Sequence, residues 1–387
     1  MPEIYLDNNA TTSAAPEVIE SLLAFFSKSY GNPSSLHRLG LQAERAVDKA
    51  RRGLSGLLVV HEDEIVFTSG GTESANLAVK GAAQACKRKG NHIITTPIEH
   101  DAVLGSVKQL EQAGFIVDFV KVNMQGKVSP ESVVELIKPN TILVAVMHVN
   151  NELGSINPIN EIAEAVKAKN KDIIFFSDGA QAFGKLEVDL THIDLYSISG
   201  HKFHAPKGSG ALYVKKKTLL QPLISGGGQE FNLRSGTQNV PNIVGLAKAA
   251  QLAYCHLKET RECWRELMAD FLEGLKNIPE VKINSPMDAL ENTLNVSFNS
   301  IPSQVMMNLL EEKGIYVSAG SACSGAKGEA SHVLKAIGLP FKRIQSAIRF
   351  SFSRYNTHEE IHYVLENIQS IIYRLKNITI NEKSHPD

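Results

Sequence analysis

The sequence predicts an α/β fold, with a mostly parallel seven-stranded sheet between helices in a large domain and a smaller α+β domain beside it. From about residue 60 to 215, short apolar runs alternate with helical patterns, which is typical of parallel strands covered by helices on both faces. After about residue 255 this alternation stops, and longer helical stretches flank two more strand candidates. The 387 residues suit two domains of about 100–200 residues each.

Seven short apolar runs are the candidate strands of the large domain. In chain order they are Glu64–Thr68, His92–Thr95, Phe115–Val120, Thr141–Met147, Ile173–Ser177, Leu195–Ser199 and Gly210–Val214. The helical patterns between them are Thr72–Arg88, Asp101–Ala113, Pro130–Leu136 and Ile159–Asn170. Because ligands of such sheets bind beyond the carboxyl ends of the strands, the residues after each strand are the candidates for chemistry.

The smaller domain is predicted from helical stretches, two strands and a loop of small residues. In chain order these are the helix Glu259–Lys276, the strand Leu294–Phe298, the helix Ser303–Lys313, the loop Ser318–Gly328, the strand Ile348–Phe352 and the helix Thr357–Leu375. We assign residues 14–257 to the large domain, and residues 1–13 and 258–387 to the small domain. The polar tail after Asn377 is expected to be frayed.

Composition excludes several classes of protein. The 40 basic and 41 acidic residues give a net charge of −1, so neither nucleic acid nor an acidic membrane surface is an expected partner. No apolar stretch approaches the about 20 residues of a membrane span, and the acidic N-terminus does not resemble a signal peptide. We therefore expect a cytoplasmic protein. The four cysteines form no C-x-x-C pair, so we expect reduced thiols and no metal site.

A glycine pair opens the first helix of the large domain. Gly70 and Gly71 follow a strand, expose backbone N–H groups and lie at the positive end of the helix dipole. Thr72 adds a hydroxyl donor. This arrangement predicts a phosphate site, but the P-loop pattern is absent, and an ordinary glycine-rich turn remains an alternative.

Two further residues follow strands of the same sheet. Lys202 comes directly after the strand Leu195–Ser199, where a lysine could bind a carbonyl compound or simply extend to solvent. Asp178 could pair with a protonated ring nitrogen, or cap a helix over Gly179–Phe183. Pyridoxal phosphate (PLP) needs a lysine for its aldehyde, an acid for its pyridinium nitrogen and a helix N-terminus for its phosphate. Together with the glycine pair, these residues favour PLP over a nicotinamide cofactor.

Longer motifs identify a family. The chain resembles, nearly from end to end, the cysteine desulfurases of the NifS/IscS type, which belong to the class V aminotransferase group of fold-type I PLP enzymes. The motifs that carry this resemblance are Leu6-Asp7-Asn8-Asn9-Ala10-Thr11-Thr12, Tyr30-Gly31-Asn32-Pro33-Ser34-Ser35, Thr68-Ser69-Gly70-Gly71-Thr72-Glu73-Ser74, Glu99-His100, His148-Val149-Asn150-Asn151-Glu152-Leu153-Gly154, Asp178-Gly179-Ala180-Gln181, Ser199-Gly200-His201-Lys202-Phe203, Arg234-Ser235-Gly236-Thr237 and Ser321-Ala322-Cys323.

The resemblance implies roles around the ring of the cofactor. Lys202 would bind the PLP aldehyde and move protons, and Asp178 would pair with the pyridinium nitrogen. His100 would stack on the ring face and act as an acid or base. Asn151 and Gln181 would contact the phenolic oxygen. From their local sequence alone, His100 could equally be a core histidine and Asn151 a turn residue.

The resemblance also implies how the phosphate is bound. Gly71, Thr72, Ser199 and His201 would hold it within one subunit. Thr237 would reach the phosphate of the other subunit, which implies a homodimer with shared sites.

Two positions depart from the family pattern. Ala205 stands where a glycine often follows His-Lys-Phe-x, and Asp178 is followed by Gly179-Ala180 rather than by alanine. Neither departure removes a functional group.

The strand Ile348–Phe352 alternates apolar and polar residues, so Arg349 projects from one face of a rigid element. An arginine there can bind a carboxylate with two parallel hydrogen bonds. The resemblance gives Arg349 this role on the α-carboxylate of the substrate, with help from Asn32. The alternative is a surface salt bridge to Glu359 or Glu360.

Cys323 lies in the loop Ser318–Gly328, which is rich in Ser, Ala and Gly and should be mobile. A cysteine on such a loop can approach a substrate and carry cargo away, and the loop resembles the extended cysteine loop of one desulfurase group. Cys86, Cys255 and Cys263 lie in helical stretches, where inert packing is expected.

We therefore expect a homodimeric PLP enzyme that converts L-cysteine to L-alanine and leaves a persulfide on Cys323. The sulfur would pass to an acceptor, such as an iron–sulfur scaffold protein or a tRNA-thiolation relay. Three alternatives stay open: another aminotransferase-like reaction on the same fold, a selenocysteine lyase and a catalytically silent scaffold.

Overall fold

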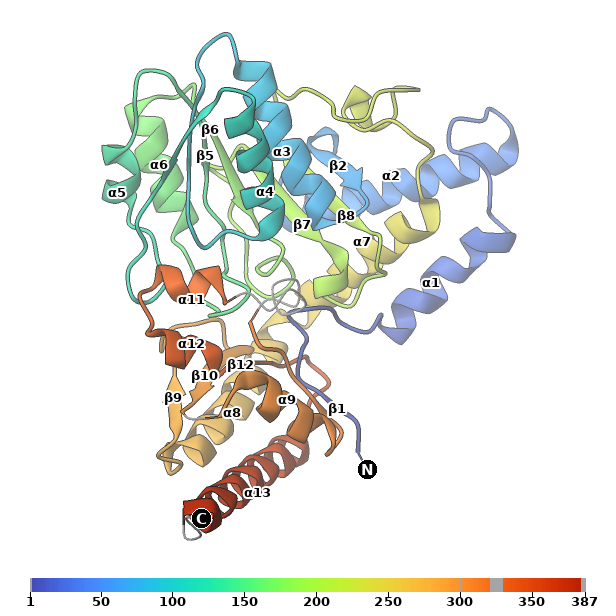
Figure 1. Cartoon of the computed structure of the whole chain (residues 1–387). Coiled ribbons are helices and arrows are strands. Elements are labelled where there is room, and N and C mark those ends of the chain that lie inside the picture. Colours follow the sequence, from blue (N-terminus) through green and yellow to red (C-terminus); the bar gives the residue numbers. More distant parts are fainter. Residues whose placement is uncertain (1, 300, 321–329, 384–387) are drawn as a thin grey trace. The chain divides into compact units, whose positions relative to one another are not determined.

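The structure is a computed structural model that describes residues 2–299, 301–320 and 330–383 (Figure 1). Backbone contacts divide the chain into two compact units. The large unit comprises residues 11–150 and 156–257, and the small unit comprises residues 1–10, 151–155 and 258–387. The five-residue segment 151–155 thus groups with the small unit, although it is inserted between two stretches of the large one, and no sequence pattern indicated this.

The large unit is built on a seven-stranded sheet, as predicted. Its order is β2 (Ile65–Thr68), β8 (Gly210–Val214), β7 (Leu195–Ser199), β6 (Ile174–Asp178), β5 (Thr141–Ala145), β3 (His92–Thr95) and β4 (Ile116–Phe119). Only β8 pairs antiparallel with its neighbours, so the sheet is mostly parallel. The carboxyl ends of β3, β5, β6 and β7 therefore meet at one edge, where ligands of such sheets bind.

Helices cover both faces of this sheet because alternate strand residues point to opposite sides. On β2, Val66 packs in a core with helices α3 (Gly71–Cys86) and α4 (Asp101–Gln112), which lie on one face of the sheet in Figure 1. Ile65 and Phe67 pack in the core of the other face, which is formed with α1 (Pro16–Ser27), α2 (Arg38–Leu58), α5 (Pro130–Glu135), α6 (Ile159–Lys169) and α7 (Val240–Cys255).

Helices α1, α2 and α7 lie outside the elements that the sequence predicted. The signal was present in α2, since Ala43, Val47, Ala50 and Leu54 recur at helical spacing and are all buried. In the parts of the chain that the structure describes, no helix is long and apolar enough to cross a membrane.

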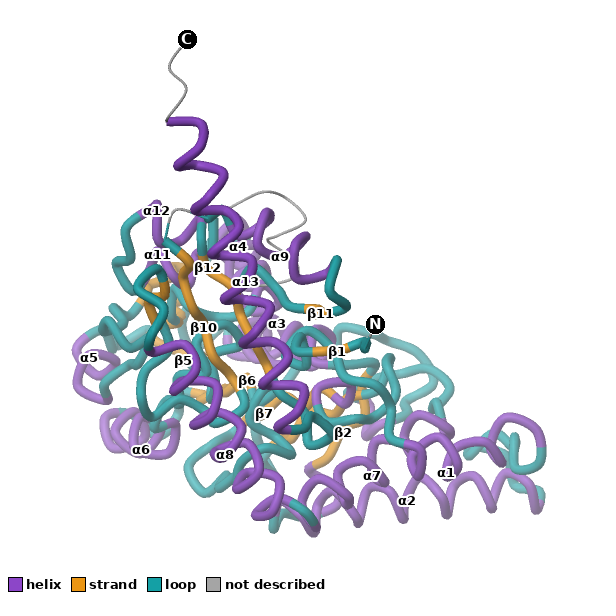
Figure 2. The backbone as a smooth tube through the Cα atoms, turned by 90° about the horizontal axis from the view of Figure 1, so that it is seen from below, coloured by secondary structure: helices purple, strands orange, loops and turns teal. Residues whose placement is uncertain are grey.

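The small unit is an α+β structure with its own core. Its antiparallel sheet has the order β12 (Ala347–Ser351), β10 (Thr293–Phe298) and β9 (Val281–Ile283), and β1 (Ile4–Tyr5) pairs parallel with β11 (Ile315–Tyr316). The helices are α8 (Leu257–Lys276), α9 (Ser303–Glu311), α11 (His332–Ala336), α12 (Phe341–Gln345) and α13 (His358–Lys383), and Figure 2 shows α13 as a long helix. Phe271 of α8 packs edge-to-face on Phe350 of β12, with ring centroids 4.9 Å apart.

The backbone is helical directly after Asn377, where the sequence predicted a frayed tail. Helix α13 continues to Lys383. Residues 378–383 contain neither glycine nor proline, the two residues that most strongly disfavour a helix.

Candidate active site

Asp178 ends β6 with its carboxylate held in place. The side chain is buried, and Oδ1 accepts hydrogen bonds from the hydroxyl of Ser197 at 2.6 Å and from the backbone N–H of Ala180 at 3.0 Å. Ser197 stands directly opposite Asp178 in the β6–β7 pairing. Residues 179–183 form turns and not a helix, so the alternative that Asp178 caps a helix there is wrong. The carboxylate of Asp178 is therefore held in one orientation at the carboxyl edge of the sheet.

The glycine pair forms a close contact beside this carboxylate. Gly70 has a φ of 151°, and Gly71 begins α3 so close to β7 that an added Cβ would lie 3.0 Å from Cβ of Ser199 and 3.8 Å from Cβ of Ala180. Without side chains here, the first N–H groups of α3 stay accessible, and exposed Thr72 follows directly. The N-terminus of α3 thus lies against the end of β7, as a phosphate site requires.

His201 and Lys202 lie in a single 3₁₀ turn after β7, Gly200–Lys202. Nδ1 of His201 is 3.0 Å from Oγ1 of Thr11. Burial, together with smaller contributions from nearby charges such as that of Lys202, lowers the pKa of His201 to about 4. The imidazole is therefore neutral near pH 7, and it can donate one hydrogen bond to an anion without carrying a charge itself.

Gln181 and His100 lie at the same carboxyl edge of the large sheet. Gln181 is buried, and its Oε1 accepts a hydrogen bond of 2.7 Å from Nζ of Lys185. His100 precedes α4, and its Nδ1 accepts the N–H of Ala102 at 3.1 Å, so it caps that helix rather than lying in the core.

Glu99 lies next to His100 and is fully buried. Its Oε1 accepts hydrogen bonds from the hydroxyl of Thr96 at 2.9 Å and from the N–H of Met147 at 2.8 Å. Burial raises the pKa of Glu99 to about 8, and the negative charge of Asp178 adds to this shift. Near pH 7 the neutral form of the Glu99 carboxyl is therefore favoured.

Tyr196 explains why glycine follows Asp178. An added Cβ on Gly179 would lie 2.1 Å from two ring carbons of fully buried Tyr196. The Tyr196 hydroxyl lies 2.9 Å from Nδ1 of His148, whose pKa burial lowers to about 4. The aromatic ring therefore occupies the space that an alanine at position 179 would need. The other departure, Ala205, needs no glycine because its φ is not positive.

Arg349 belongs to the small unit and is almost completely buried. Its Nη2 lies 2.5 Å from Oδ1 of Asp7, and its Nη1 donates to the backbone oxygen of Asn151 at 3.0 Å. The alternative of a surface salt bridge to Glu359 or Glu360 is wrong, because β12 directs the side chain inward. Among the described residues, Nε of Arg349 has no hydrogen-bond partner.

The structure brings one group of the predicted residues together at a single edge of the sheet, but not the others. The residues gathered at the carboxyl edge of the large sheet are Gly71, Thr72, His100, Asp178, Gln181, Ser199, His201 and Lys202. Asn32 and Thr237 are exposed in loops of the large unit, whereas Asn151 and Arg349 belong to the small unit. Cys323 lies outside the described residues.

One expectation about the other cysteines is wrong. Cys86 is buried and Cys263 is half-buried, but Cys255 is exposed because it is the last residue of α7, beyond the packed part of that helix. Its thiol is therefore accessible.

The gathered residues fit PLP. The buried carboxylate of Asp178 suits a protonated ring nitrogen, Lys202 supplies an amine from the turn after β7 at the same sheet edge, and the open N-terminus of α3 suits the phosphate. The sequence analysis missed Ser197 and Thr11, which hold Asp178 and His201. Thr11 lies in the motif Leu6-Asp7-Asn8-Asn9-Ala10-Thr11-Thr12, and Ser197 lies in the predicted strand Leu195–Ser199, but only the fold connects either residue to its partner.

The comparisons with known proteins agree with this site. The chain matches the aminotransferase class-V family over residues 4–364 and belongs to it. It is 44% identical over 379 residues to a cysteine desulfurase IscS of Methanosarcina thermophila, covering 97% of this chain and 93% of that protein. Members of this family bind PLP, so PLP is the cofactor of this chain.

Solved structures of related proteins have the same fold as this chain. A NifS-like protein superposes with a TM-score of 0.91 at 41% identity, covering 96% of this chain and all of that one. SspA, solved in complex with cysteine, superposes with a TM-score of 0.81 at 38% identity over 92% of this chain and 100% of that one.

Gly179→Ala should displace the turn that follows Asp178, because the new methyl group meets the Tyr196 ring. We expect the variant to release PLP roughly 10-fold faster or more, because small displacements of positioning groups have effects of this size. Cofactor absorbance after gel filtration measures this. The control is Gly56→Ala in α2, where an added Cβ meets nothing within 4 Å; it should leave PLP retention unchanged. Normal retention by Gly179→Ala would show that the turn tolerates the methyl group.

His148 should make the protein less stable in acid. The unfolded state takes up a proton near the ordinary histidine pKa of about 6.5, whereas folded His148 does so only near pH 4. The free energy of unfolding should therefore fall as the pH drops from about 6.5 to about 4, by up to about 3 kcal/mol from this group.

Urea unfolding at several pH values tests the role of His148. His148→Gln should have a shallower acid slope than the wild type, because its amide does not titrate. His362→Gln, at an exposed position of α13, is the control and should keep the wild-type slope. Equal slopes for wild type and His148→Gln would contradict the assignment.

Proposed function

We propose that this protein is a PLP-dependent cysteine desulfurase, which converts L-cysteine to L-alanine and leaves the sulfur as a persulfide on Cys323. The observation that carries the proposal is the set of an acid, a lysine and an open helix N-terminus at one sheet edge, in a chain 44% identical to a cysteine desulfurase. The cysteine in the complex of the related SspA supports the choice of substrate.

The residues of the large unit would hold the cofactor. PLP supplies an electron sink next to the α-carbon of a bound amino acid. Lys202 would bind its aldehyde and move the α-proton, and Asp178 would keep its ring nitrogen protonated. His100 would cover one ring face. Gln181 would contact the phenolic oxygen, and the family resemblance gives the same role to Asn151, which belongs to the small unit.

The phosphate would be bound by neutral donors. These are the N–H groups at Gly71 and Thr72, the hydroxyl of Ser199 and the neutral imidazole of His201. The low pKa of His201 supports this role, because a neutral ring binds the anion equally well across the physiological pH range.

Arg349 would bind the α-carboxylate of cysteine, with Asn32 assisting. The support is its buried Nε, which has no partner among the described residues although Nη1 and Nη2 do. A buried guanidinium donor without a partner is costly unless a ligand completes it. A substrate carboxylate is such a ligand.

Cys323 would take the sulfur. Its thiolate attacks the sulfur of the substrate, the Cβ–S bond breaks, and a proton added at carbon completes alanine. An acceptor thiolate then attacks the outer sulfur of the persulfide, the S–S bond breaks and the Cys323 thiolate is regenerated; an iron–sulfur scaffold or a tRNA-thiolation relay has suitable chemistry for this acceptor.

We also infer a homodimer in which Thr237 reaches the phosphate site of the second subunit. Two features support it. Thr237 is exposed in its own subunit. Helix α1 carries Ile19, Leu23 and Phe26 on one outward stripe, each about half or more exposed, and such a stripe is typical of an interface.

Arg349→Ala should weaken cysteine binding by about 2–5 kcal/mol, because it removes one partner of a buried charge pair. PLP content should stay normal. The variant also leaves the carboxylate of Asp7 unpaired, so we compare it with the double variant Asp7→Asn/Arg349→Ala. The double variant should be more stable than Arg349→Ala but should bind cysteine no better. An unchanged KM for cysteine in Arg349→Ala would place the carboxylate elsewhere.

Cys323→Ala should retain PLP but release no alanine. After brief exposure of the wild type to cysteine without reductant, mass spectrometry should find one added sulfur on the peptide that contains Cys323. Cys255→Ala is the demanding control, because that thiol is exposed, and it should stay active. Sulfur on Cys255 instead, or wild-type alanine release by Cys323→Ala, would overturn the proposal.

A further inference from the structure

A strained turn precedes the segment that carries Thr237. The three residues Glu230, Phe231 and Asn232 have φ values of 48°, 60° and 65°. This left-handed region disfavours residues with a Cβ, and three in succession are unusual. The turn therefore persists only because other contacts hold it in place.

A buried ion pair provides these contacts. Arg51 of α2 binds Glu230 with two hydrogen bonds, Nη1 to Oε2 and Nη2 to Oε1, both of 2.8 Å. The side chains are only 8% and 2% exposed. Oε2 of Glu230 also accepts the backbone N–H of Phe67 on β2 at 2.8 Å, and Nη1 of Arg51 donates to the backbone oxygen of Ile65. The strained turn is thus tied to a core helix and to the sheet.

Aromatic rings enclose the guanidinium of Arg51. Its Cζ lies 4.7 Å from the ring centroid of Phe67 and 4.9 Å from that of Phe231. Phe231 is the central residue of the turn, so Arg51 holds the turn by its aromatic side chain as well as by the carboxylate next to it. Lysine cannot make this combination of a planar stack and two parallel hydrogen bonds.

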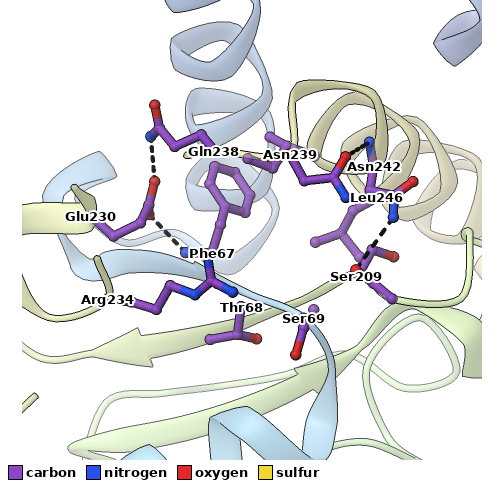
Figure 3. Close-up of a pocket in the computed structure, with 13 residues that line it drawn as sticks. Phe67, Thr68, Ser69, Ser209, Glu230, Arg234, Gln238, Asn239, Asn242 and Leu246 are labelled. Atoms are coloured by element: carbon purple, nitrogen blue, oxygen red, sulfur yellow. Dashed lines mark hydrogen bonds between the residues drawn. The ribbon is translucent and has the colours of Figure 1, made fainter. Parts of the chain in front are cut away.

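The carboxylate of Glu230 also binds Gln238, which follows Thr237 at the other end of this segment. Nε2 of Gln238, the residue directly after Thr237, donates to Oε1 of Glu230 at 2.5 Å, and Figure 3 shows Glu230 between Gln238 and the backbone of Phe67. Arg234 within the segment binds Glu73 of α3 at 2.8 Å. Residues 230–238 therefore form a loop whose two ends meet at one carboxylate, with Thr237 exposed beside the closing bond.

The small cavity beside this carboxylate does not explain the arrangement. It has a volume of about 70 Å³, which is room for a few water molecules. Its polar lining includes Glu230, Arg234 and Gln238, which already bind other side chains.

We infer that Arg51 and Glu230 are positioning residues for the active site of the second subunit: they fix the loop 230–238 so that Thr237 is presented in one geometry to the partner's cofactor phosphate. This inference rests on the homodimer with shared sites proposed above. The ion pair is buried in one subunit, but its function is exerted in the active site of the other subunit.

The first test compares conservative variants. Glu230→Gln keeps the shape of the side chain but loses its charge, and Arg51→Lys keeps the charge but loses the stack and the paired bonds. Both should release PLP roughly 10-fold faster than the wild type, as expected when a positioning contact is displaced. Far-UV circular dichroism and the dimer should be unchanged. The matched control is Arg52→Lys, the exposed neighbour that pairs with Glu62 at 3.7 Å, and it should release PLP at the wild-type rate.

The second test asks in which subunit Glu230 acts. Hybrid dimers of one Lys202→Ala subunit and one Glu230→Gln subunit are isolated with two affinity tags. If Glu230 acts on the partner, the site with intact Lys202 receives its loop from the subunit with intact Glu230, so one complete site forms. Alanine release from cysteine should then exceed that of both parent homodimers. If Glu230 only supports its own subunit, no complete site forms.

The outcomes separate this inference from the proposal on which it rests. Thr237→Ala should also release PLP faster; if it does not, or if the wild type is a monomer, the shared site itself is wrong. If Thr237→Ala has this effect but Glu230→Gln and Arg51→Lys match the wild type, the ion pair does not position the loop. A hybrid no more active than its parents overturns action on the second subunit.

Discussion

The buried carboxylate of Asp178 is the constraint on which the large unit depends. A charged group at the end of a central strand is costly unless its hydrogen bonds are made, and here Ser197 on the next strand and the backbone of Ala180 make them. The first bond fixes the register of β6 with β7, and the second fixes the turn after β6. That turn brings Gly179 against the ring of Tyr196, so the requirement for glycine follows from the requirement for a held carboxylate.

Burial also controls which other groups carry charge around this carboxylate. Desolvation disfavours the charged form of each group: it raises the pKa of Glu99 to about 8 and lowers the pKa of His148 and His201 to about 4. Three titratable side chains near the sheet edge are thus mainly neutral near pH 7.

The second constraint is conformational strain far from the chemistry. The left-handed residues 230–232 are stable because Arg51 and Glu230 form a buried, two-bonded pair between two aromatic rings. The net contribution of such a pair to stability can be small. Removing one partner is nevertheless strongly destabilising, because it leaves a buried charge without its counter-charge. Its value lies in specifying one conformation for a loop that the rest of the fold leaves exposed.

The sequence by itself determined the sheet and the family, and it predicted the residues that the proposed phosphate and pyridinium sites would use. Strands such as Leu195–Ser199 were predicted at their observed bounds because a buried strand is a short, continuous apolar run, and Lys202 and Asp178 were found because they follow such runs. Only the tertiary structure decided which residues they contact. The grouping of residues 151–155 with the small unit, the pairing of Arg349 with Asp7, the exposure of Cys255 and the contact between Arg51 and Glu230 left no local signal. Periodicity reports which face of an element is buried, but it carries no information on which distant residue meets that face, because such contacts are set by the packing of whole elements.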